Sequence, residues 1–261
     1  MHVIGKDRAF LWAHPEYVAK KREEDRFHKM LKKLKEHYPL QYLIRKTGFY
    51  GLEFEVNPSV LIPRPETEML VEKSLEAIKK ISEKKLRIAD IGTGSGAIII
   101  ALAKLLKEQS HYSQMEFFGT DISVEALNTA TKNAKNNGVL EKIIFKKGDL
   151  AEPLEEKMDI IIANLPYISQ TVFEASPTRA ELEYEPKQAL IATRDGLALI
   201  FKLLQQTKKH LSPNGTVLLE IGHDQGERVR QYASKLYPEA KIEIFKDFCN
   251  RDRVVRIHIK S

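Results

Sequence analysis

Two short segments hold residues whose types and spacing suggest chemistry. The first, Asn164–Tyr167, reads NLPY and directly follows a hydrophobic run. The second is a glycine-rich turn, DIGTGSG, at Asp90–Gly96. Neither segment decides the matter alone, because Asn and Pro end strands in many folds and glycine turns after strands are widespread. Together, and in this order along the chain, they suggest methyl transfer to a planar nitrogen.

The NLPY segment has the groups needed to hold an amide or amino nitrogen. Such a nitrogen is a poor nucleophile, because its lone pair is delocalised into the adjacent π system. The side-chain oxygen of Asn164 and the main-chain carbonyl of Leu165 can each accept one N–H of an NH₂ group. Pro166 would keep the turn rigid, and Tyr167 can stack on the plane of the amide. Positioning and electrostatics would then carry the reaction without a strong base.

The glycine-rich turn has the features of a cofactor site. Its glycines allow a sharp turn that brings backbone N–H groups to a ligand at a helix N-terminus. With Ala97 the turn also fits the dinucleotide pattern GxGxxA, so by itself it suits nicotinamide and S-adenosylmethionine equally. Asp121, at the end of the next apolar run, can accept hydrogen bonds from both ribose hydroxyls of either cofactor. Asp90 favours S-adenosylmethionine, since its carboxylate is placed to meet the charged methionine end, and the NLPY segment has no obvious use in hydride transfer.

Two residues after the third strand-like run extend this candidate site. Asp149 and Leu150 follow KIIFKKG. There a third loop would close over the adenine, with Asp149 as hydrogen-bonding partner and Leu150 as apolar contact. A helix cap and a core leucine explain the pair equally well.

Composition predicts an ordinary globular protein. The chain has 261 residues, 43% hydrophobic content and a net charge of +6, which permits an anionic partner such as RNA but is also common solubilising decoration. Its single cysteine, Cys249, fits a reducing compartment. No apolar stretch approaches the roughly 20 residues that span a bilayer, and no signal-peptide pattern begins the chain. We therefore expect a cytoplasmic protein. The scattered histidines lack metal-ligand spacing, so we expect no metal site.

The first third of the chain predicts a small, separate part. Residues 16–37 are rich in Lys and Glu with apolar residues at helical spacing, which predicts one amphipathic helix. The alternation in residues 49–62 predicts a hairpin turning around Asn57 and Pro58. The segment IPRPETE then opens a helix that would connect this part to the rest.

From residue 85 onward, apolar runs alternate with helical segments. This order predicts an α/β fold with a mostly parallel sheet covered on both faces. The last two runs are close enough to pair as a hairpin, which would add one antiparallel strand. We expect three parts: residues 1–47 as an N-terminal helical substrate-recognition domain, residues 48–84 as hairpin and connecting helix, and residues 85–261 as the catalytic domain.

The residues also match a family: the chain resembles the release factor glutamine methyltransferases. The resemblance covers nearly the whole chain and includes HVIGKDRAFLWAHPE, PLQYL, FYGLEFEV, LIPRPETE, DIGTGSG, GTDIS, NLPYI, YEPKQAL with DGL, LLEIG with QG, and DRVV. LIPRPETE is the most specific segment, because it belongs to the glutamine enzymes. The NPPY-type loop, in contrast, is shared with amino methyltransferases of adenine and guanine. The resemblance implies a Rossmann-like class I methyltransferase with a seven-stranded sheet that methylates the glutamine of the GGQ motif in peptide chain release factors.

The resemblance also assigns the site residues. It implies that Asp121, Leu150 and Asn164 line an S-adenosylmethionine site, and that Asn164–Tyr167 hold the substrate glutamine. Arg64 and Glu66 fit both the border of that glutamine pocket and an ordinary helix start. The cofactor set also includes the five residues of the glycine turn: Gly92, Thr93, Gly94, Ser95 and Gly96.

The chain departs from the family pattern at several positions. Leu165 replaces the first proline of NPPY, and Leu150 stands where an aromatic residue is common. Asn250 replaces a usual glycine, and asparagine tolerates left-handed backbone geometry best after glycine. Arg45 also falls where glycine is usual. The helical part before the hairpin is shorter than is normal in the family, where it contacts the release factor.

Three other functions stay open at this point. A sister enzyme that methylates a glutamine of a ribosomal protein would share every catalytic element. A nucleic-acid amino methyltransferase would use the same loop on a flipped base, although such enzymes usually add a dedicated RNA or DNA module. A binding module that had lost turnover would not need an intact NLPY segment. Over these alternatives we favour a monomeric enzyme that has a release factor as its partner and needs neither nucleic acid nor a membrane.

Overall fold

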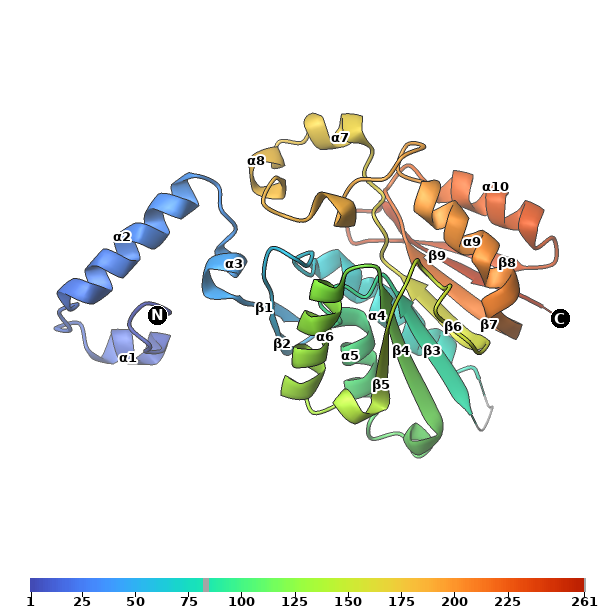
Figure 1. Cartoon of the computed structure of the whole chain (residues 1–261), viewed down its shortest axis with the longest axis horizontal. Helices are drawn as coiled ribbons and strands as arrows, with labels where there is room; N and C mark the ends of the chain where they lie inside the picture. Colours follow the sequence, from blue (N-terminus) through green and yellow to red (C-terminus); the bar gives the residue numbers. More distant parts are fainter. Residues whose placement is uncertain (82–84, 261) are drawn as a thin grey trace.

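The computed structural model describes residues 1–81 and 85–260. Within these residues a seven-stranded sheet forms the centre of the molecule, with strand order β5-β4-β3-β6-β7-β9-β8 (Figure 1). Strand β9 runs antiparallel to both of its neighbours, and the other pairings are parallel, so the predicted α/β sheet is confirmed. The strands are β3 (Leu86–Ile91), β4 (Met115–Asp121), β5 (Ile143–Lys147), β6 (Met158–Ala163), β7 (Leu211–Glu220), β8 (Lys241–Lys246) and β9 (Asp252–His258).

Alternating side chains bury both faces of the sheet. Ile88 of β3 and Ile160 of β6 point to one face, while Ala89 and Ile161 point to the other. Helices α4 (Glu68–Ile78), α5 (Ala97–Leu105) and α6 (Val124–Asn136) cover the first face, and α9 (Ala198–His210) and α10 (Gly226–Leu236) cover the second (Figure 1). Apolar burial on both faces explains why these strands read as nearly continuous hydrophobic runs.

A two-stranded hairpin precedes the sheet, but its turn lies earlier than predicted. Strands β1 (Lys46–Phe49) and β2 (Leu52–Glu55) pair antiparallel across Tyr50 and Gly51, whose φ angles are 50° and 73°. Two positive φ angles fit a tight hairpin turn, and glycine supplies one of them without strain. The turn predicted at Asn57 and Pro58 is therefore wrong. Asn57 instead accepts a hydrogen bond from the Ser59 N–H at 2.8 Å, which makes a local turn after the hairpin.

The connecting helix α4 starts from the proline-rich segment as expected. A short 3-10 turn, η1 (Pro65–Thr67), leads into α4, which packs against β6, β7 and α5. The Glu68 carboxylate accepts a hydrogen bond from the Tyr50 N–H at 2.6 Å, which fixes the hairpin turn to the start of the helix. The domain boundary expected at residue 84 lies outside the described residues.

The N-terminal part contains three helices that extend away from the sheet: α1 (Arg8–Ala13), α2 (Lys21–Lys35) and α3 (Leu40–Ile44) (Figure 1). The prediction of one helix over residues 16–37 is wrong at its start. The Glu23 carboxylate accepts a hydrogen bond from the Lys20 N–H at 2.7 Å, so the first turn begins at Lys21. None of the residues of α2 is buried, and Phe27 is 51% exposed.

The remaining short elements lie in the loops. The segment after β6 carries α7 (Gln170–Glu174), α8 (Arg179–Leu182) and η4 (Lys187–Ala189), while η2 (Tyr112–Gln114) and η3 (Leu140–Lys142) precede β4 and β5. Asn250 has a φ of 59°, which confirms the left-handed geometry expected where asparagine replaces glycine. Within the described ranges, no helix is both long and apolar enough to cross a membrane.

Candidate active site

The register of three parallel strands brings the predicted site residues together. Ile91 of β3 pairs with Thr120 of β4 and with Ala163 of β6. The residues that follow, Gly92, Asp121 and Asn164, therefore leave the sheet side by side at its carboxyl edge. Ligands of open α/β sheets bind in the crevice outside this edge.

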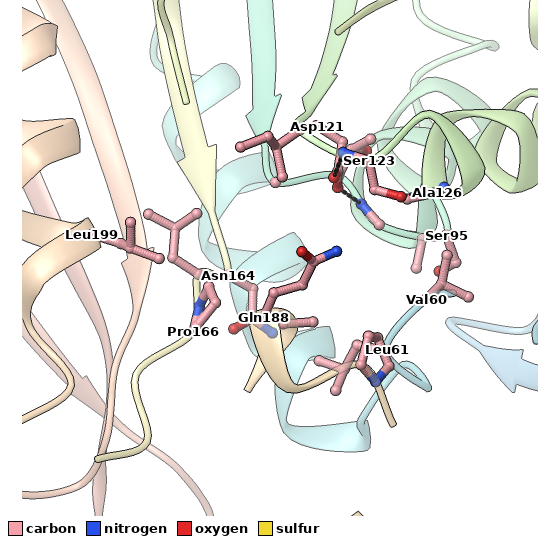
Figure 2. A pocket seen from close by; sticks show the side chains of 18 of the residues that line it. Val60, Leu61, Ser95, Asp121, Ser123, Ala126, Asn164, Pro166, Gln188 and Leu199 are labelled. Atoms are coloured by element: carbon pink, nitrogen blue, oxygen red, sulfur yellow. Dashed lines mark hydrogen bonds between the residues drawn. The ribbon is translucent and has the colours of Figure 1, made fainter. Parts of the chain in front are cut away.

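A cavity of about 400 Å³ lies there. In Figure 2, Asp121 and Ser123 stand on one side of it and Asn164 and Pro166 on another. The cavity is large enough for a nucleoside-sized ligand. Of the predicted residues, the lining includes Arg64, Gly92, Thr93, Gly94, Ser95, Asp121, Asp149, Leu150, Asn164, Leu165 and Pro166, but not Glu66, Asp90, Gly96 or Tyr167.

The glycine-rich turn is locked into its shape by its neighbours. The Gly94 N–H donates to the Asp121 carboxylate at 2.9 Å, and the Thr93 N–H donates to the Thr120 carbonyl at 2.8 Å. Gly96 precedes α5 with a φ of 81°, and a Cβ there would lie 2.7 Å from a methyl carbon of Ile100. Gly96 therefore serves the packing of α5, while the residues before it face the cavity.

Asp90 is fully buried beneath the turn. One carboxylate oxygen accepts a hydrogen bond from the Thr93 hydroxyl at 2.7 Å, and the other has no partner among the described residues. Burial and, to a lesser extent, the nearby Asp121 carboxylate raise the pKa of Asp90 to about 7 against the lowering effect of the Thr93 hydrogen bond. An unpartnered buried carboxylate oxygen is costly, and a cationic group of a ligand would offset that cost.

Asp121 forms part of the cavity wall at the end of β4. Its two oxygens accept hydrogen bonds from the Gly94 and Ser123 N–H groups, each at 2.9 Å. Burial raises the pKa of its carboxyl group, while these N–H groups lower it. Each oxygen keeps a second lone pair, so the carboxylate can still accept from a ligand hydroxyl.

Asp149 and Leu150 both reach the cavity, with different roles in the fold. The Asp149 carboxylate forms an ion pair with Lys202 of α9. Leu150 is 8% exposed, has a φ of 55° and accepts a hydrogen bond at its carbonyl from the Thr120 hydroxyl. The hydrogen bond from Asp149 to an adenine stays a prediction.

The NLPY segment sits on the carboxyl end of β6. The Asn164 side-chain N–H₂ donates to the Thr67 hydroxyl at 3.0 Å, so the carbonyl oxygen of this amide is the group left to accept from a substrate. Leu165 is only 4% exposed and packs so closely on Gly92 that a Cβ on that glycine would lie 3.0 Å from its side chain. The leucine that replaces proline therefore joins the acceptor segment to the glycine turn by apolar contact.

Tyr167 faces away from the cavity. Its hydroxyl donates to the Glu220 carboxylate at 3.0 Å, and its carbonyl accepts from the Gln225 side chain at 2.9 Å. Burial and the Glu220 charge raise the pKa of the Tyr167 hydroxyl. The predicted stacking of this ring on a substrate amide stays a prediction.

Arg64 connects the LIPRPETE and YEPKQAL segments, which are far apart in the sequence. Its guanidinium forms an ion pair with Glu185 of YEPKQAL, a side chain that is 4% exposed. The other Glu185 oxygen accepts from the Ile62 N–H at 3.1 Å. Arg64 thus lines the cavity and also ties the segment after β6 to LIPRPETE, while its place at the border of a glutamine pocket stays a prediction.

Aromatic side chains join the N-terminal part to the cavity wall. The rings of Tyr38 and Tyr184 meet edge to face with centroids 5.0 Å apart, and the Tyr184 hydroxyl donates to the Glu36 carbonyl at 3.0 Å. The Tyr42 hydroxyl donates to the carbonyl of Val60, which lines the cavity. The N-terminal part is therefore in direct contact with the segments that form the wall of the site.

Sequence reasoning missed several residues of the site. Thr67, Glu220 and Gln225 form hydrogen bonds with the NLPY segment, and Thr67 and Gln188 line the cavity. Their segments carry the family resemblance, but the sequence alone gives these residues no role. No spacing rule pairs residue 67 with 164, because only the fold brings them together.

Comparison with family descriptions divides the chain in two. Residues 82–243 match a methyltransferase domain. Residues 1–44 match the PrmC N-terminal domain.

Curated relatives cover nearly the full chain. "Release factor glutamine methyltransferase" from Streptococcus pneumoniae is 38% identical over 94% of this chain and 84% of the relative. The protein of the same name from Bacillus anthracis is 36% identical over 99% and 90%, and that from Bacillus subtilis is 37% identical over 98% and 87%. The chain belongs to the release factor glutamine methyltransferase family.

Solved structures outside this family share its fold. A ribosomal protein L11 methylase from Lactobacillus delbrueckii subsp. bulgaricus has a TM-score of 0.53 at 24% identity, covering 79% of this chain and 84% of that chain. The human Mettl16 catalytic domain has a TM-score of 0.61 at 18% identity, covering 81% and 77%. These likenesses support the Rossmann-like methyltransferase fold of this family member.

Gly196 provides a test of how the NLPY segment is held. Its φ is 84°, and a Cβ there would lie 1.9 Å from the Tyr167 carbonyl oxygen. We expect Gly196→Ala to lower the free energy of unfolding by about 1–2 kcal/mol for the left-handed backbone and by about 1–3 kcal/mol more for the clash. Denaturant unfolding measures the difference.

Gly138→Ala is the matched control for this substitution. Gly138 has a φ of 70° but nothing within 4 Å of an added Cβ, so only the backbone cost applies. Equal losses in the two variants would show that the contact between Gly196 and Tyr167 is not tight.

Proposed function

We propose that this protein transfers a methyl group from S-adenosylmethionine to the side-chain amide nitrogen of the GGQ glutamine in a peptide chain release factor. The observation that carries the proposal is the Asn164 amide, whose N–H₂ group is engaged by Thr67 so that its oxygen is left to accept, beside the glycine turn. The names of the curated relatives support the same substrate.

The residues around the cavity fit the proposed cofactor. Asp121 lines the cavity and suits the ribose hydroxyls. Asp90 is buried just beneath the lining, where the charge of its carboxylate would attract the ammonium group of the methionine end. Leu150 gives the adenine an apolar contact. When bound, S-adenosylmethionine supplies a methyl group on a positively charged sulfur, which makes the methyl carbon electrophilic.

The chain's own groups prepare the acceptor nitrogen. The Asn164 side-chain oxygen and the Leu165 carbonyl would each accept one N–H of the glutamine amide and so direct its lone pair toward the methyl group. Holding both reactants in line converts a bimolecular reaction into an effectively unimolecular one. An N-methylated amide nitrogen that still carries its extra proton is strongly acidic, so water can take that proton without a dedicated base.

The N-terminal helices suit a protein partner. Residues 1–47 hold twelve Lys and Arg residues against six Asp and Glu residues. The exposed face of α2 adds an apolar side chain, Phe27, to this basic surface. An apolar anchor surrounded by charge fits recognition of an acidic protein surface, here that of the release factor.

Asp90 predicts a pH dependence of cofactor affinity. Because its pKa is about 7 in the free protein, the carboxyl group is mostly neutral at pH 6. A cationic ligand group favours the charged form, so we expect affinity to rise as the pH increases through 7 and to be about tenfold weaker at pH 6 than on the plateau. Calorimetric titration between pH 5.5 and 7.5 measures the cofactor affinity at each pH.

Stability of the free protein should move in the opposite direction. Since the pKa of Asp90 is raised above its ordinary value of 3.8, its contribution to stability is lost as the pH rises from about 4 to 7.

Asp90→Asn should bind the cofactor more weakly and with little pH dependence. A variant that keeps the wild-type pH profile would remove Asp90 from the site.

Mass spectrometry of a purified release factor tests the function itself. Incubation with the enzyme and S-adenosylmethionine should add one methyl group to a single glutamine. Asn164→Ala should slow this transfer at least about a hundredfold, since it removes an acceptor from the reacting group, and leave cofactor affinity within about threefold.

Asn128→Ala is the matched control. Asn128 is an exposed residue of α6, and its truncation should leave turnover unchanged. Methylation of another residue type, or full activity of Asn164→Ala, would contradict the proposal.

A further inference from the structure

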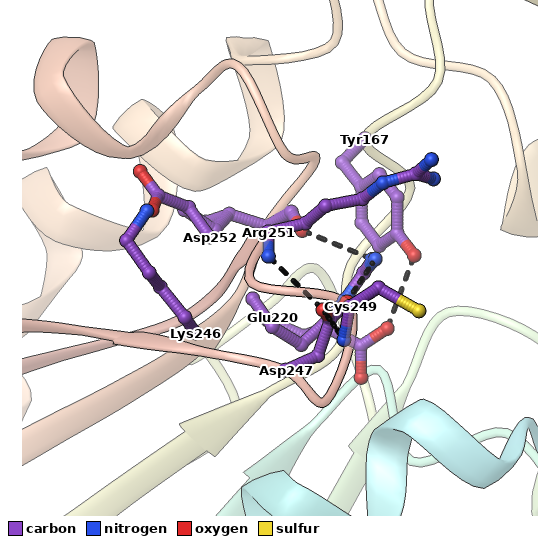
Figure 3. Close-up of polar contacts among 9 residues, drawn as sticks. Tyr167, Glu220, Lys246, Asp247, Cys249, Arg251 and Asp252 are labelled. Carbon is purple, nitrogen blue, oxygen red and sulfur yellow. Dashed lines mark hydrogen bonds and ion pairs between the residues drawn. The ribbon is translucent and has the colours of Figure 1, made fainter.

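A buried carboxylate stands behind the NLPY segment. Glu220 ends β7 and is 1% exposed. One of its oxygens accepts the hydrogen bond from the Tyr167 hydroxyl at 3.0 Å (Figure 3), and the other has no partner among the described residues. Glu220 does not line the cavity, so it would act on a substrate only through its neighbours.

The same carboxylate also lies next to the support of Asn164. The Thr67 hydroxyl favours the charged form of Glu220, and this hydroxyl accepts the hydrogen bond from the Asn164 amide at 3.0 Å. Glu220 therefore contacts Tyr167 directly by a hydrogen bond and is linked to Asn164 through Thr67.

A cation completes the surroundings of Glu220. Arg253 of β9 pairs with Asp247 at 3.0 Å and donates to the Ile221 carbonyl at 3.4 Å. Its charge lowers the pKa of Glu220, although burial still raises that pKa overall and the neighbouring Glu66 raises it further. Arg253 therefore acts on Glu220 through its charge and not through a direct ion pair, and one Glu220 oxygen has no partner among the described residues.

Packing alone does not account for a carboxylate at this position. The adjoining strand residues, Leu219 and Val254, are apolar and fully buried. Replacement of buried charges by apolar residues is often neutral or stabilising, and a carboxylate oxygen without a partner costs free energy. The contact that Glu220 makes in return is with the segment proposed to hold the substrate.

We propose that Glu220 is a positioning residue for methyl transfer, which acts through the Tyr167 hydroxyl and, with Thr67, through the Asn164 amide to fix the NLPY segment in the geometry that receives the glutamine. This inference rests on the proposed function and deepens it. It gives the LLEIG segment a role at the site.

The proposal is tested by a double-mutant cycle between Glu220 and Tyr167. The variants are Glu220→Leu, Tyr167→Phe and the combination of both. For each, kcat and KM for release factor methylation are measured at saturating cofactor, together with the cofactor Kd and the free energy of unfolding. We expect each single substitution to lower kcat roughly tenfold to a hundredfold, the scale of a lost hydrogen bond to a charged group.

The two effects should not add. If Glu220 acts through the Tyr167 hydroxyl, the double variant should be within about threefold of the slower single variant. Cofactor Kd should stay within about threefold throughout, because none of the substituted side chains lines the cavity. Independent effects that multiply in kcat would overturn the proposal.

Glu220→Gln separates positioning from charge and packing. The glutamine amide keeps the size of Glu220 and an acceptor for the Tyr167 hydroxyl, so kcat should recover to within about threefold of wild type. A kcat as low as that of Glu220→Leu would contradict the assigned role. Glu243→Gln, on β8 and paired with Arg256, is the matched control and should leave kcat unchanged.

Two outcomes keep the inference separate from the proposed function. Absence of methylation by the wild-type enzyme would reject the proposed function itself. If Glu220→Leu does not fold, Tyr167→Phe and Glu220→Gln still decide the matter. A Tyr167→Phe variant with wild-type kcat would then overturn the positioning role while leaving the function intact.

Discussion

The parallel register of β3, β4 and β6 is the constraint on which the site depends. It sets Gly92, Asp121 and Asn164 next to one another, although they are far apart in the chain. Each of the three residues begins a loop that lines the cavity, and the apolar contact between Leu165 and Gly92 joins the loop after β6 to the loop after β3. A shift of one residue in either pairing would turn these side chains to the opposite face of the sheet.

The loops at this edge are held from behind by polar contacts of long sequence separation. Arg64 binds Glu185, Thr67 binds Asn164, and Gln225 binds the Tyr167 carbonyl. These contacts are partly buried, and hydrogen bonds and ion pairs are stronger where water is partly excluded. They convert flexible connections into a rigid surface, which is the requirement for catalysis by positioning.

The sequence predicted the features that repeat locally. Hydrophobic runs predicted the strands, and the structure places the glycine-rich turn and the NLPY segment at strand ends as expected. The hairpin turn was misplaced because Asn57 and Pro58 are stronger turn signals than Tyr50, whose positive φ depends on the pairing around it. The roles of Glu220 and Gln225 could not be predicted, because each depends on a contact between residues more than fifty positions apart.

Buried carboxylates distinguish this edge of the sheet from the rest of the core. Asp90 and Glu220 each keep one oxygen without a partner among the described residues, and burial raises the pKa of both. Such groups oppose folding, and apolar residues occupy most positions of equivalent depth elsewhere in the strands. Asp90 lies beneath the glycine-rich turn and Glu220 behind the NLPY segment, so the two costs fall on the segments proposed to hold the cofactor and the substrate. In the proposed function, the fold thus gives up stability at the places where a cation and an amide are oriented.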